Sequence, residues 1–481
     1  MLTPSEEVGL AGHRLARRIQ RALESIPNDE MLGLLRSIHD LATERHLSYQ
    51  REGSTETIRL LACPITLRSD QLAYLHYVSL TVLNCIRRLP DFYFADPTVR
   101  EILKVTSEEE RWLLDCWTPA HREANPIFAR LDAVVDFPSA NWKDSLRFLE
   151  PNLTGIGGVH LAPTSDRVLA DLLVPALRAR DPRIRLQLGP DIRELLLQDM
   201  MEHLEAIGRP EGQIVLLDPK YETEGPDEPE ALARYYQERH GIRVLHADPA
   251  ELRLVDGEVY YQDARVDLGY RDYGVLDLFD LAEEGVDVAP MRALFSGNRM
   301  ISSIAAELDQ KSCWEVFTDP DLVQRYFSAE ERQVLRRHIP WTRVVADRRT
   351  TDPNGNRIEL LDYLVAERET LVLKPNRSYG GEGVTVGPST PEAEWDAVIQ
   401  TALADEERWV VQQLVTLPVQ EFPVPDADGR VHSEPFYVVM GFVPSRYGLG
   451  LVARASQKQV VNVAMHGGEC AVMLSASSVA G

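Results

Sequence analysis

The chain has 481 residues, of which 44% are hydrophobic and 26% charged, and its formal net charge is −24. These proportions are typical of a globular protein that is long enough to bury two or three cores. The negative charge argues against a nucleic-acid surface, because phosphate binding needs clustered Lys and Arg. The five cysteines form no C-x-x-C pair, so the sequence predicts neither a zinc site nor a disulfide framework.

The first residues contain no basic segment followed by an apolar one, as a signal peptide would. No apolar run reaches the ~18 residues that a membrane span requires. We therefore expect a cytoplasmic protein that binds neither membrane nor nucleic acid.

The first quarter of the chain is expected to be helical. Thr3-Pro4-Ser5-Glu6 has the composition of a capping box with proline at the first helical position. Further along, Ser69 is a candidate cap for a helix whose apolar stripe runs from Leu72 to Leu89. Such a region could bind a partner protein or a second copy of the chain.

Two extended segments and a Gly-rich loop follow this helical region. Because side chains alternate along a strand, Arg130 and Asp132 share one face of the first segment, and Glu150 and Asn152 share one face of the second. If the strands pair, two carboxylates, an amide and a guanidinium converge. Oxygen ligands of this kind suit Mg²⁺, which takes one or two carboxylates together with substrate phosphates. A surface salt-bridge group would show the same pattern.

The middle of the chain alternates helical and extended segments, which indicates a parallel α/β unit. The expected buried strands are Arg183–Leu188, Gln213–Leu217 and Ile242–Leu245. Another strand ends in Tyr270-Arg271-Asp272, the position at which open α/β sheets bind ligands. An ordinary strand whose end is exposed to solvent would show the same polar residues.

The segment Glu369–Gly387 predicts a strand, a glycine-rich loop and a second strand. Lys374 ends the first apolar run, and Gly380, Gly381 and Gly383 follow it. Glycines let the backbone approach a bulky anion and direct several N–H groups at it, and the lysine adds a point charge. The G-x-x-x-x-G-K-[ST] spacing of a Walker A loop is absent. A plain hairpin with a flexible tip is the alternative.

Together these motifs resemble the circularly permuted ATP-grasp proteins, a family that includes glutathionylspermidine synthetases and uncharacterised bacterial relatives. The nucleotide half of that family is represented by D-x-K (Asp309–Lys311), by I-P-x-T (Ile339–Thr342) and by the strand-K-P with its glycine loop. The metal-binding motifs R-x-D and E-x-N usually come last, whereas here they precede the others. The resemblance covers residues 127–475 and leaves out the N-terminal helices.

The resemblance implies an α/β (α+β) protein with an ATP-grasp fold in permuted order. The implied divisions are a helical N-terminal region (1–125), metal-binding strands (126–165), an α/β substrate domain (166–300) and nucleotide-binding lobes (301–475).

The resemblance also implies the cofactors ATP and Mg²⁺ and a set of site residues. Arg130 and Lys374 would be catalytic, and Asp132, Glu150 and Asn152 would bind the metal. The nucleotide would contact Lys311, Lys374, Ser378, Tyr379, Gly380, Gly381, Gly383 and a hinge of Gln412, Gln413, Leu414 and Val415. The loop residues Thr154 and Gly155 would face the acceptor substrate; independently of the resemblance, the strand end makes Arg271 a candidate substrate residue. The spacing of Arg454 and Asn462 leaves open whether they contact the nucleotide.

The implied activity is a ligase that joins a small-molecule or peptide carboxylate to an amine through an acyl phosphate. Two alternatives remain: a kinase acting on a small acceptor, and a non-catalytic nucleotide-binding scaffold. Two departures from the family pattern matter. Gln412-Gln413 stand where an acidic residue often contacts the ribose, and Pro151 within E-x-N requires a strand position without a backbone donor, such as an edge.

Overall fold

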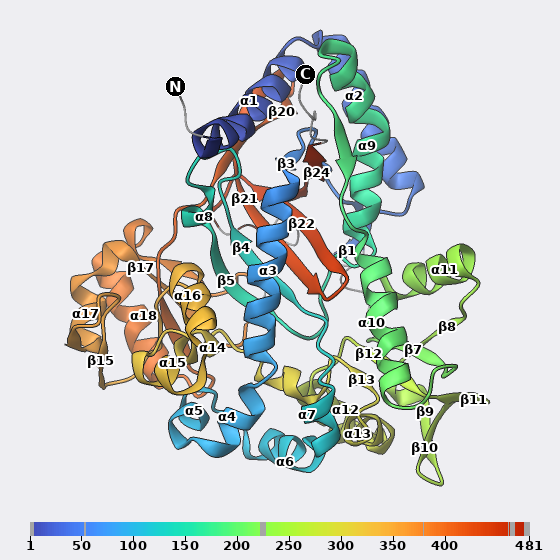
Figure 1. The fold of residues 1–481 in the computed structure, drawn as a ribbon, viewed down its shortest axis with the longest axis vertical. Helices are drawn as coiled ribbons and strands as arrows, with labels where there is room; N and C mark the ends of the chain where they lie inside the picture. Colours follow the sequence, from blue (N-terminus) through green and yellow to red (C-terminus); the bar gives the residue numbers. More distant parts are fainter. Residues whose placement is uncertain are drawn as a thin grey trace.

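The computed structural model of the chain describes residues 4–51, 54–221, 228–378, 380–459, 461 and 467–475. It is a mixed α/β structure, as the sequence predicted, in which helices surround several separate sheets (Figure 1). Within these ranges, no helix combines the length and the apolar character that crossing a membrane requires.

The largest sheet has six strands and lies at the centre of the molecule (Figure 1). In spatial order its strands are β23 (Gly468–Glu469), β22 (Gly448–Ser456), β21 (Val431–Ser445), β4 (Arg130–Val134) and β5 (Arg147–Asn152), with β20 (Val419–Pro425) also pairing with β21. Strands β4 and β5 therefore lie beside strands from the C-terminal part of the chain. Because β5 is at the sheet edge, Pro151 needs no partner on its outer side, as its sequence context required.

Strands β4 and β5 pair in antiparallel orientation, which confirms the pairing expected from the sequence. Arg130 lies opposite Asn152, and Asp132 lies opposite Glu150. The register then shifts at Leu149, which has no partner in the ladder, so β5 carries a bulge next to the polar pairs. The four polar side chains consequently share one face of the sheet.

The N-terminal region packs onto this central sheet. Its longest buried helix, α3 (Ser69–Ile86), lies against β21 and β22 and buries Leu75, Val78 and Val82 (Figure 1). Arg68 is the N-cap residue of α3, so Ser69 is the first helical residue and not the cap. The expected Thr3 cap lies outside the described residues. The other helices are α1 (Pro4–Glu24), α2 (Asn28–Glu44), α4 (Leu89–Ala95), α5 (Pro97–Ile102), α6 (Ser107–Cys116) and α7 (Pro119–Glu123), with short strands β1 (Ser48–Arg51), β2 (Ser54–Thr57) and β3 (Ile65–Leu67).

A parallel sheet forms the α/β part of the chain. Its strands, in spatial order, are β13 (Met300–Ile301), β12 (Leu268–Arg271), β7 (Ile214–Leu217) and β8 (Val244–Ala247). The elements around it are α10 (Ile192–Ala206), α11 (Glu228–His240), α12 (Val275–Glu283), α13 (Ala289–Ser296) and the antiparallel strands β9 (Leu252–Val255), β10 (Glu258–Tyr261) and β11 (Ala264–Val266). Elsewhere, α8 (Trp142–Ser145) connects β4 to β5, and α9 (Leu161–Arg180) packs against α1, α2 and β22.

One expected strand of this parallel sheet is wrong. Only Leu186–Leu188 of the segment Arg183–Leu188 is extended, as β6, and it pairs in antiparallel orientation with β24 (Val472–Ser475) in another sheet. The sequence RIRLQL alternates polar and apolar residues, which suits a half-buried antiparallel strand. The strands of the parallel sheet read instead as continuous apolar runs, such as IVLL in β7.

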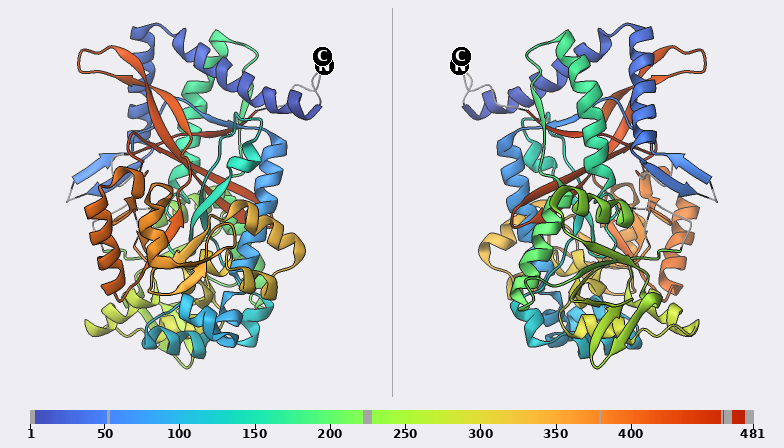
Figure 2. Two further views of the ribbon diagram at one scale, coloured as in Figure 1. Left: turned by 90° about the vertical axis from the view of Figure 1, so that its left-hand side faces the viewer. Right: turned by 90° about the vertical axis from the view of Figure 1, so that its right-hand side faces the viewer.

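The expected glycine-rich hairpin forms part of a four-stranded antiparallel sheet. Its strands, in spatial order, are β14 (Thr342–Val344), β19 (Trp409–Gln413), β17 (Leu371–Pro375) and β18 (Thr385–Val386). Leu371 and Leu373 pack against Trp395 and Ile399 of α18 (Glu392–Ala404). The remaining elements are α14 (Cys313–Val316), α15 (Pro320–Tyr326), α16 (Ala329–His338), α17 (Leu360–Ala366), β15 (Arg349–Thr351) and β16 (Arg357–Glu359). In the side views this lobe lies beside the central sheet (Figure 2).

Candidate active site

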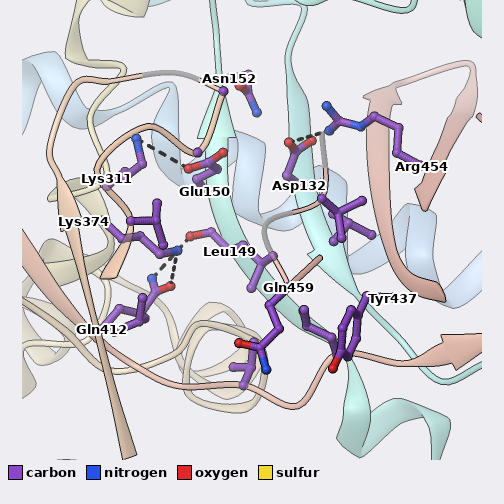
Figure 3. Close-up of a pocket in the computed structure, with 18 of the residues that line it drawn as sticks. Asp132, Leu149, Glu150, Asn152, Lys311, Lys374, Gln412, Tyr437, Arg454 and Gln459 are labelled. Atoms are coloured by element: carbon purple, nitrogen blue, oxygen red, sulfur yellow. Dashed lines mark hydrogen bonds and ion pairs between the residues drawn. The ribbon is translucent and has the colours of Figure 1, made fainter. Parts of the chain in front are cut away.

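A pocket of about 930 Å³ lies between the central sheet and the sheet of the glycine-rich hairpin. Its walls bring together residues that are far apart in the sequence, from β4 and β5 on one side and from β17 and β19 on the other (Figure 3). The close-up places Asp132 and Glu150 on neighbouring strands, with Lys374 and Gln412 facing them. This is the juxtaposition on which the sequence interpretation depended.

Asp132 lies between two arginines on the pocket face of the central sheet. Its carboxylate accepts a hydrogen bond from Arg130 Nε at 2.7 Å and another from Arg454 Nη2 at 2.8 Å. Burial opposes ionisation of Asp132, but the two guanidinium groups outweigh it and lower the pKa of this carboxyl. Arg130 also donates to the carbonyl of Gly157 at 2.7 Å, so its guanidinium is held between the strand and the Gly-rich loop.

Glu150 and Asn152 complete the oxygen-rich face. The Glu150 carboxylate lies 3.5 Å from Lys311 Nζ. The amide nitrogen of Asn152 donates to the carbonyl of Arg130 at 3.2 Å, which leaves the amide oxygen as an acceptor.

These donors fit a magnesium ion that is bound together with phosphates. A carboxylate offers about four lone-pair sites, so Asp132 can accept its arginine bonds and still ligate. In the part of the chain that the structure describes, no three His, Cys, Asp or Glu side chains converge as a metal cage. A divalent ion here would therefore use Asp132, Glu150 and Asn152 and complete its shell with substrate oxygens and water, as Mg²⁺ commonly does.

Two lysines supply positive charge to the opposite wall. Lys374 is 8% exposed and donates from Nζ to Gln412 Oε1 at 2.9 Å. Burial lowers the pKa of Lys374 to about 8, and the nearby Glu150 partly opposes this shift. Lys311 Nζ donates to the carbonyl of Ser378 at 2.6 Å, so it holds the start of the glycine loop close to Glu150.

The glycine loop has a backbone that other residues rarely adopt. Gly380, Gly381 and Gly383 have φ values of +68°, +77° and +70°. A Cβ on Gly383 would come within 2.6 Å of Pro375 Cγ, so this residue also permits a close approach to the end of β17. Gly380 and Gly381 line the pocket, whereas Gly383 shapes the turn behind them. Tyr379, expected to bind the nucleotide, lies outside the described residues.

The N-terminal region takes part in this wall as well. Arg377, immediately before Ser378, forms an ion pair of 2.6 Å with Glu109 of α6, and Glu109 is fully buried. Glu109 also caps its own helix through the backbone N–H of Thr106 at 2.8 Å. A helix of the N-terminal region thus anchors the start of the glycine loop.

The predicted hinge lines the pocket but differs in detail from the expectation. The Gln412 side chain donates to the carbonyl of Leu149 at 3.3 Å and to Thr342 Oγ1 at 3.0 Å, so it ties the two sheets together. The backbone N–H groups of Gln413 and Leu414 donate to the carbonyls of Trp341 and Thr370, both at 2.8 Å. An adenine ring would therefore bind to other backbone groups of the hinge, near the lining residue Val415.

The substrate residues expected from the sequence are partly corrected. Gly155 lines the pocket, but its neighbour Thr154 is not among the lining residues. The expectation for Arg271 is wrong. Its side chain is fully buried, pairs with Glu307 at 2.6 Å and donates to the carbonyl of Ser302 at 2.7 Å, so it ties the parallel sheet to the following turn.

Three further residues line the site: Asp309, the first residue of the D-x-K motif, Arg454, and Glu469, which no motif indicated. Asp309 accepts the backbone N–H of Leu153 at 2.6 Å, and burial raises its pKa to about 7. Arg454 forms an ion pair with Asp132, which places it in the pocket although its spacing in the sequence did not decide its role. Asn462, the other undecided residue, lies outside the described residues. Glu469 lines the pocket from a two-residue strand that no periodicity could reveal.

Comparisons with known proteins agree with this geometry at the level of the fold. No family model matches the chain. A segment of 176 residues, 34% of this chain, is 31% identical to the putative glutamate–cysteine ligase 2-3 of Frankia alni, and the match spans only 18% of that protein's length.

Solved structures give a longer match. The apo structure of a glutathione synthetase-like effector, GSS30, from Globodera pallida superposes with a TM-score of 0.62 at 13% identity, covering 94% of this chain and 98% of that one. A RimK domain protein from Sphaerobacter thermophilus reaches a TM-score of only 0.25 over 50% of this chain, too low to define a shared fold. The permuted motif order stays a prediction. The chain therefore shares its overall fold with the glutathione synthetase-like effector.

Proposed function

We propose that this protein is an ATP- and Mg²⁺-dependent ligase that joins a carboxylate to an amine. The observation that carries the proposal is a single pocket with Lys374, Lys311 and the glycine loop on one wall and Arg130, Asp132, Glu150 and Asn152 on the other. The glutathione synthetase-like fold and the ligase name of the partial relative support it.

In this proposal each wall has a distinct task. Lys374, Lys311 and the loop Ser378–Gly383 hold the phosphates, and the hinge around Val415 contacts the adenine. Asp132, Glu150 and Asn152 hold Mg²⁺, and the loop at Gly155 faces the acceptor. When bound, Mg²⁺ neutralises phosphate charge and helps to align the transferring group.

The chemistry begins with activation of the carboxylate, which is a poor electrophile. Its oxygen attacks the γ-phosphorus of ATP, giving an acyl phosphate and ADP, and an amine then displaces the phosphate. Phosphoryl transfer depends on positioning and on charges placed where charge develops. The guanidinium of Arg130 is fixed for that purpose by Asp132 and the Gly157 carbonyl, and we assign it to the transferring phosphoryl group.

The test combines ADP release with trapping of the intermediate. The protein is incubated with ATP, Mg²⁺ and hydroxylamine against a panel of amino acids, peptides and polyamines. We expect at least one carboxylate to yield both ADP and a hydroxamate, because hydroxylamine attacks an acyl phosphate. ADP without hydroxamate would identify a kinase, and neither product with any candidate would indicate a scaffold; either result would overturn the ligase.

A further inference from the structure

One carboxylate of the pocket has no task in the proposed reaction. The carboxylates that line the pocket, among the described residues, are Asp132, Glu150, Asp309, Glu369 and Glu469. The first two belong to the metal face, Asp309 binds the backbone of Leu153, and Glu369 is exposed and paired with Arg368. Glu469 remains.

Glu469 is buried without a cationic partner. It is 5% exposed, and its Oε2 accepts a hydrogen bond from Ser165 Oγ of α9 at 2.5 Å. Within the described part of the chain, no Lys, Arg or His nitrogen lies within 4 Å of this carboxylate, so it forms none of the salt bridges found there. Burial of an unpaired carboxylate is costly unless it gains a proton or a cationic partner. A ligand that carries an ammonium group would supply both.

The position of Glu469 places such a ligand beside the reacting groups. β23 lies at the opposite edge of the central sheet from β5, and Glu469 pairs in register with Arg454 on β22. Three strand spacings of about 4.8 Å each separate β23 from β4. Glu469 and the metal-binding residues line the same pocket, and the Arg454 side chain lies between them on this sheet face. Arg454 is fixed by its ion pair with Asp132, so it separates the two carboxylates electrostatically.

We propose that Glu469 is a catalytic residue of the acceptor site, which receives the ammonium group of the amine substrate and removes the proton that the amine must lose before it attacks. This inference rests on the proposed ligase function. It assigns the acceptor as an amine that is protonated in solution.

The proposed step balances as follows in atoms and charge. The ammonium gives one proton to the Glu469 carboxylate, leaving a neutral amine and a neutral carboxylic acid. The nitrogen then attacks the carbonyl carbon of the acyl phosphate, and a C–N bond forms as the C–O bond to phosphate breaks. The second nitrogen proton leaves with the phosphate, and Glu469 returns its own proton to water.

The surroundings of Glu469 suit this role at neutral pH. Burial raises the pKa of Glu469 to about 7, the Ser165 hydrogen bond and the charges of Arg454 and Arg130 lower it, and Glu228 of α11 raises it. Asp166 of α9 also faces this carboxylate, since Glu469 contributes to the raised pKa of Asp166. A base with a pKa near the working pH is the most effective proton acceptor.

The test compares two nucleophiles in the variant Glu469→Gln, with the best carboxylate and amine from the panel. Hydroxylamine is uncharged at neutral pH and needs no base, whereas an ordinary amine does. We expect Glu469→Gln to lose at least ~100-fold in amide formation at pH 7, the lower end of general-base contributions, while hydroxamate formation changes less than threefold. The rate of amide formation should rise through about pH 7 in the wild type and lose this limb in the variant. Glu392→Gln, an exposed change on α18, is the matched control and should alter neither rate.

Three results would overturn the assignment. Equal losses with both nucleophiles would show that Glu469 acts through structure. A lowered unfolding temperature of Glu469→Gln would accompany that result. Unchanged amide formation would show that another group takes the proton. Absence of any hydroxamate with the wild-type protein would refute the ligase itself, and the role of Glu469 with it.

Discussion

Lys374 places a positive charge where the protein by itself disfavours one. Its burial lowers the pKa to about 8 from the usual 10.5, although it must meet phosphate as a cation in the proposed reaction. Bound phosphate would restore the charge, because a nearby anion stabilises the protonated lysine. The same burial that weakens the free lysine therefore strengthens its contact with an anion in a water-poor site.

We expect the affinity for Mg·ATP to fall as the pH rises from 7 to 9.5, since Lys374 loses its proton around pH 8 in the free protein. The contribution of Lys374 to the stability of the ligand-free protein should instead rise with pH. Between pH 8 and 10.5 the unfolded chain binds more protons at this lysine, so its contribution to the free energy of unfolding rises with pH. Calorimetric titration across this range measures the first effect. Lys374→Met should bind weakly at pH 7 and lose the slope, while the exposed Lys104→Met should behave as the wild type; equal slopes in all three proteins would contradict the assignment.

At the scale of elements, side chains connect the hairpin β17–β18 and its loop to the bulged strand β5. Lys311 binds the loop through the Ser378 carbonyl, and Gln412 of the neighbouring strand binds the Leu149 carbonyl at the bulge. The bulge aims Glu150 at the pocket, and bulges commonly serve this purpose beside active sites. The glycine turn is thus held between the two walls.

Gly383→Ala should weaken Mg·ATP binding about tenfold, a loss of ~1.4 kcal/mol. The new Cβ would lie within 2.6 Å of Pro375 Cγ, so the loop must move away from β17. Gly429→Ala is the matched control. Its φ of +74° imposes a similar backbone strain of about 1 kcal/mol, but nothing lies within 4 Å of its Cβ. Both variants should lower the unfolding temperature, Gly383→Ala by more because of its contact with Pro375, and only Gly383→Ala should lose affinity by calorimetry; equal affinities would refute the role of the loop.

At the scale of the whole molecule, the pocket is formed by segments from almost the entire chain. The central sheet joins β4 and β5 to strands near the C-terminus, and α3 and α6 of the N-terminal region support this sheet and the glycine loop. A ligand that contacts both walls therefore links parts that fold from distant sequence.

Mg·ATP should raise the unfolding temperature of the whole protein, because a ligand at 100 times its Kd adds ~2.7 kcal/mol to the stability of the native state. Differential scanning fluorimetry with ATP, with Mg²⁺ and with both separates the contributions, and the two together should exceed either alone. The double variant Asp132→Asn/Glu150→Gln should retain the effect of ATP and lose the added effect of Mg²⁺. No shift at millimolar Mg·ATP would count against a nucleotide site here.

The sequence by itself determined the local structure of the site. Alternation placed Arg130 with Asp132 and Glu150 with Asn152, and the glycines after Lys374 predicted the hairpin; the structure confirms both. These features depend on neighbours a few positions apart, so a single sequence contains the information.

Only the tertiary structure decided which side chains the pocket receives. Arg271 ends a strand as predicted, yet docking against Glu307 buries it completely. Glu469 reaches the pocket because β23 pairs with β22. The side-chain amide of Gln412 donates a hydrogen bond to the carbonyl of Leu149 in another sheet. Such contacts join residues that lie tens to hundreds of positions apart, and they form only when whole sheets dock, which no local pattern specifies.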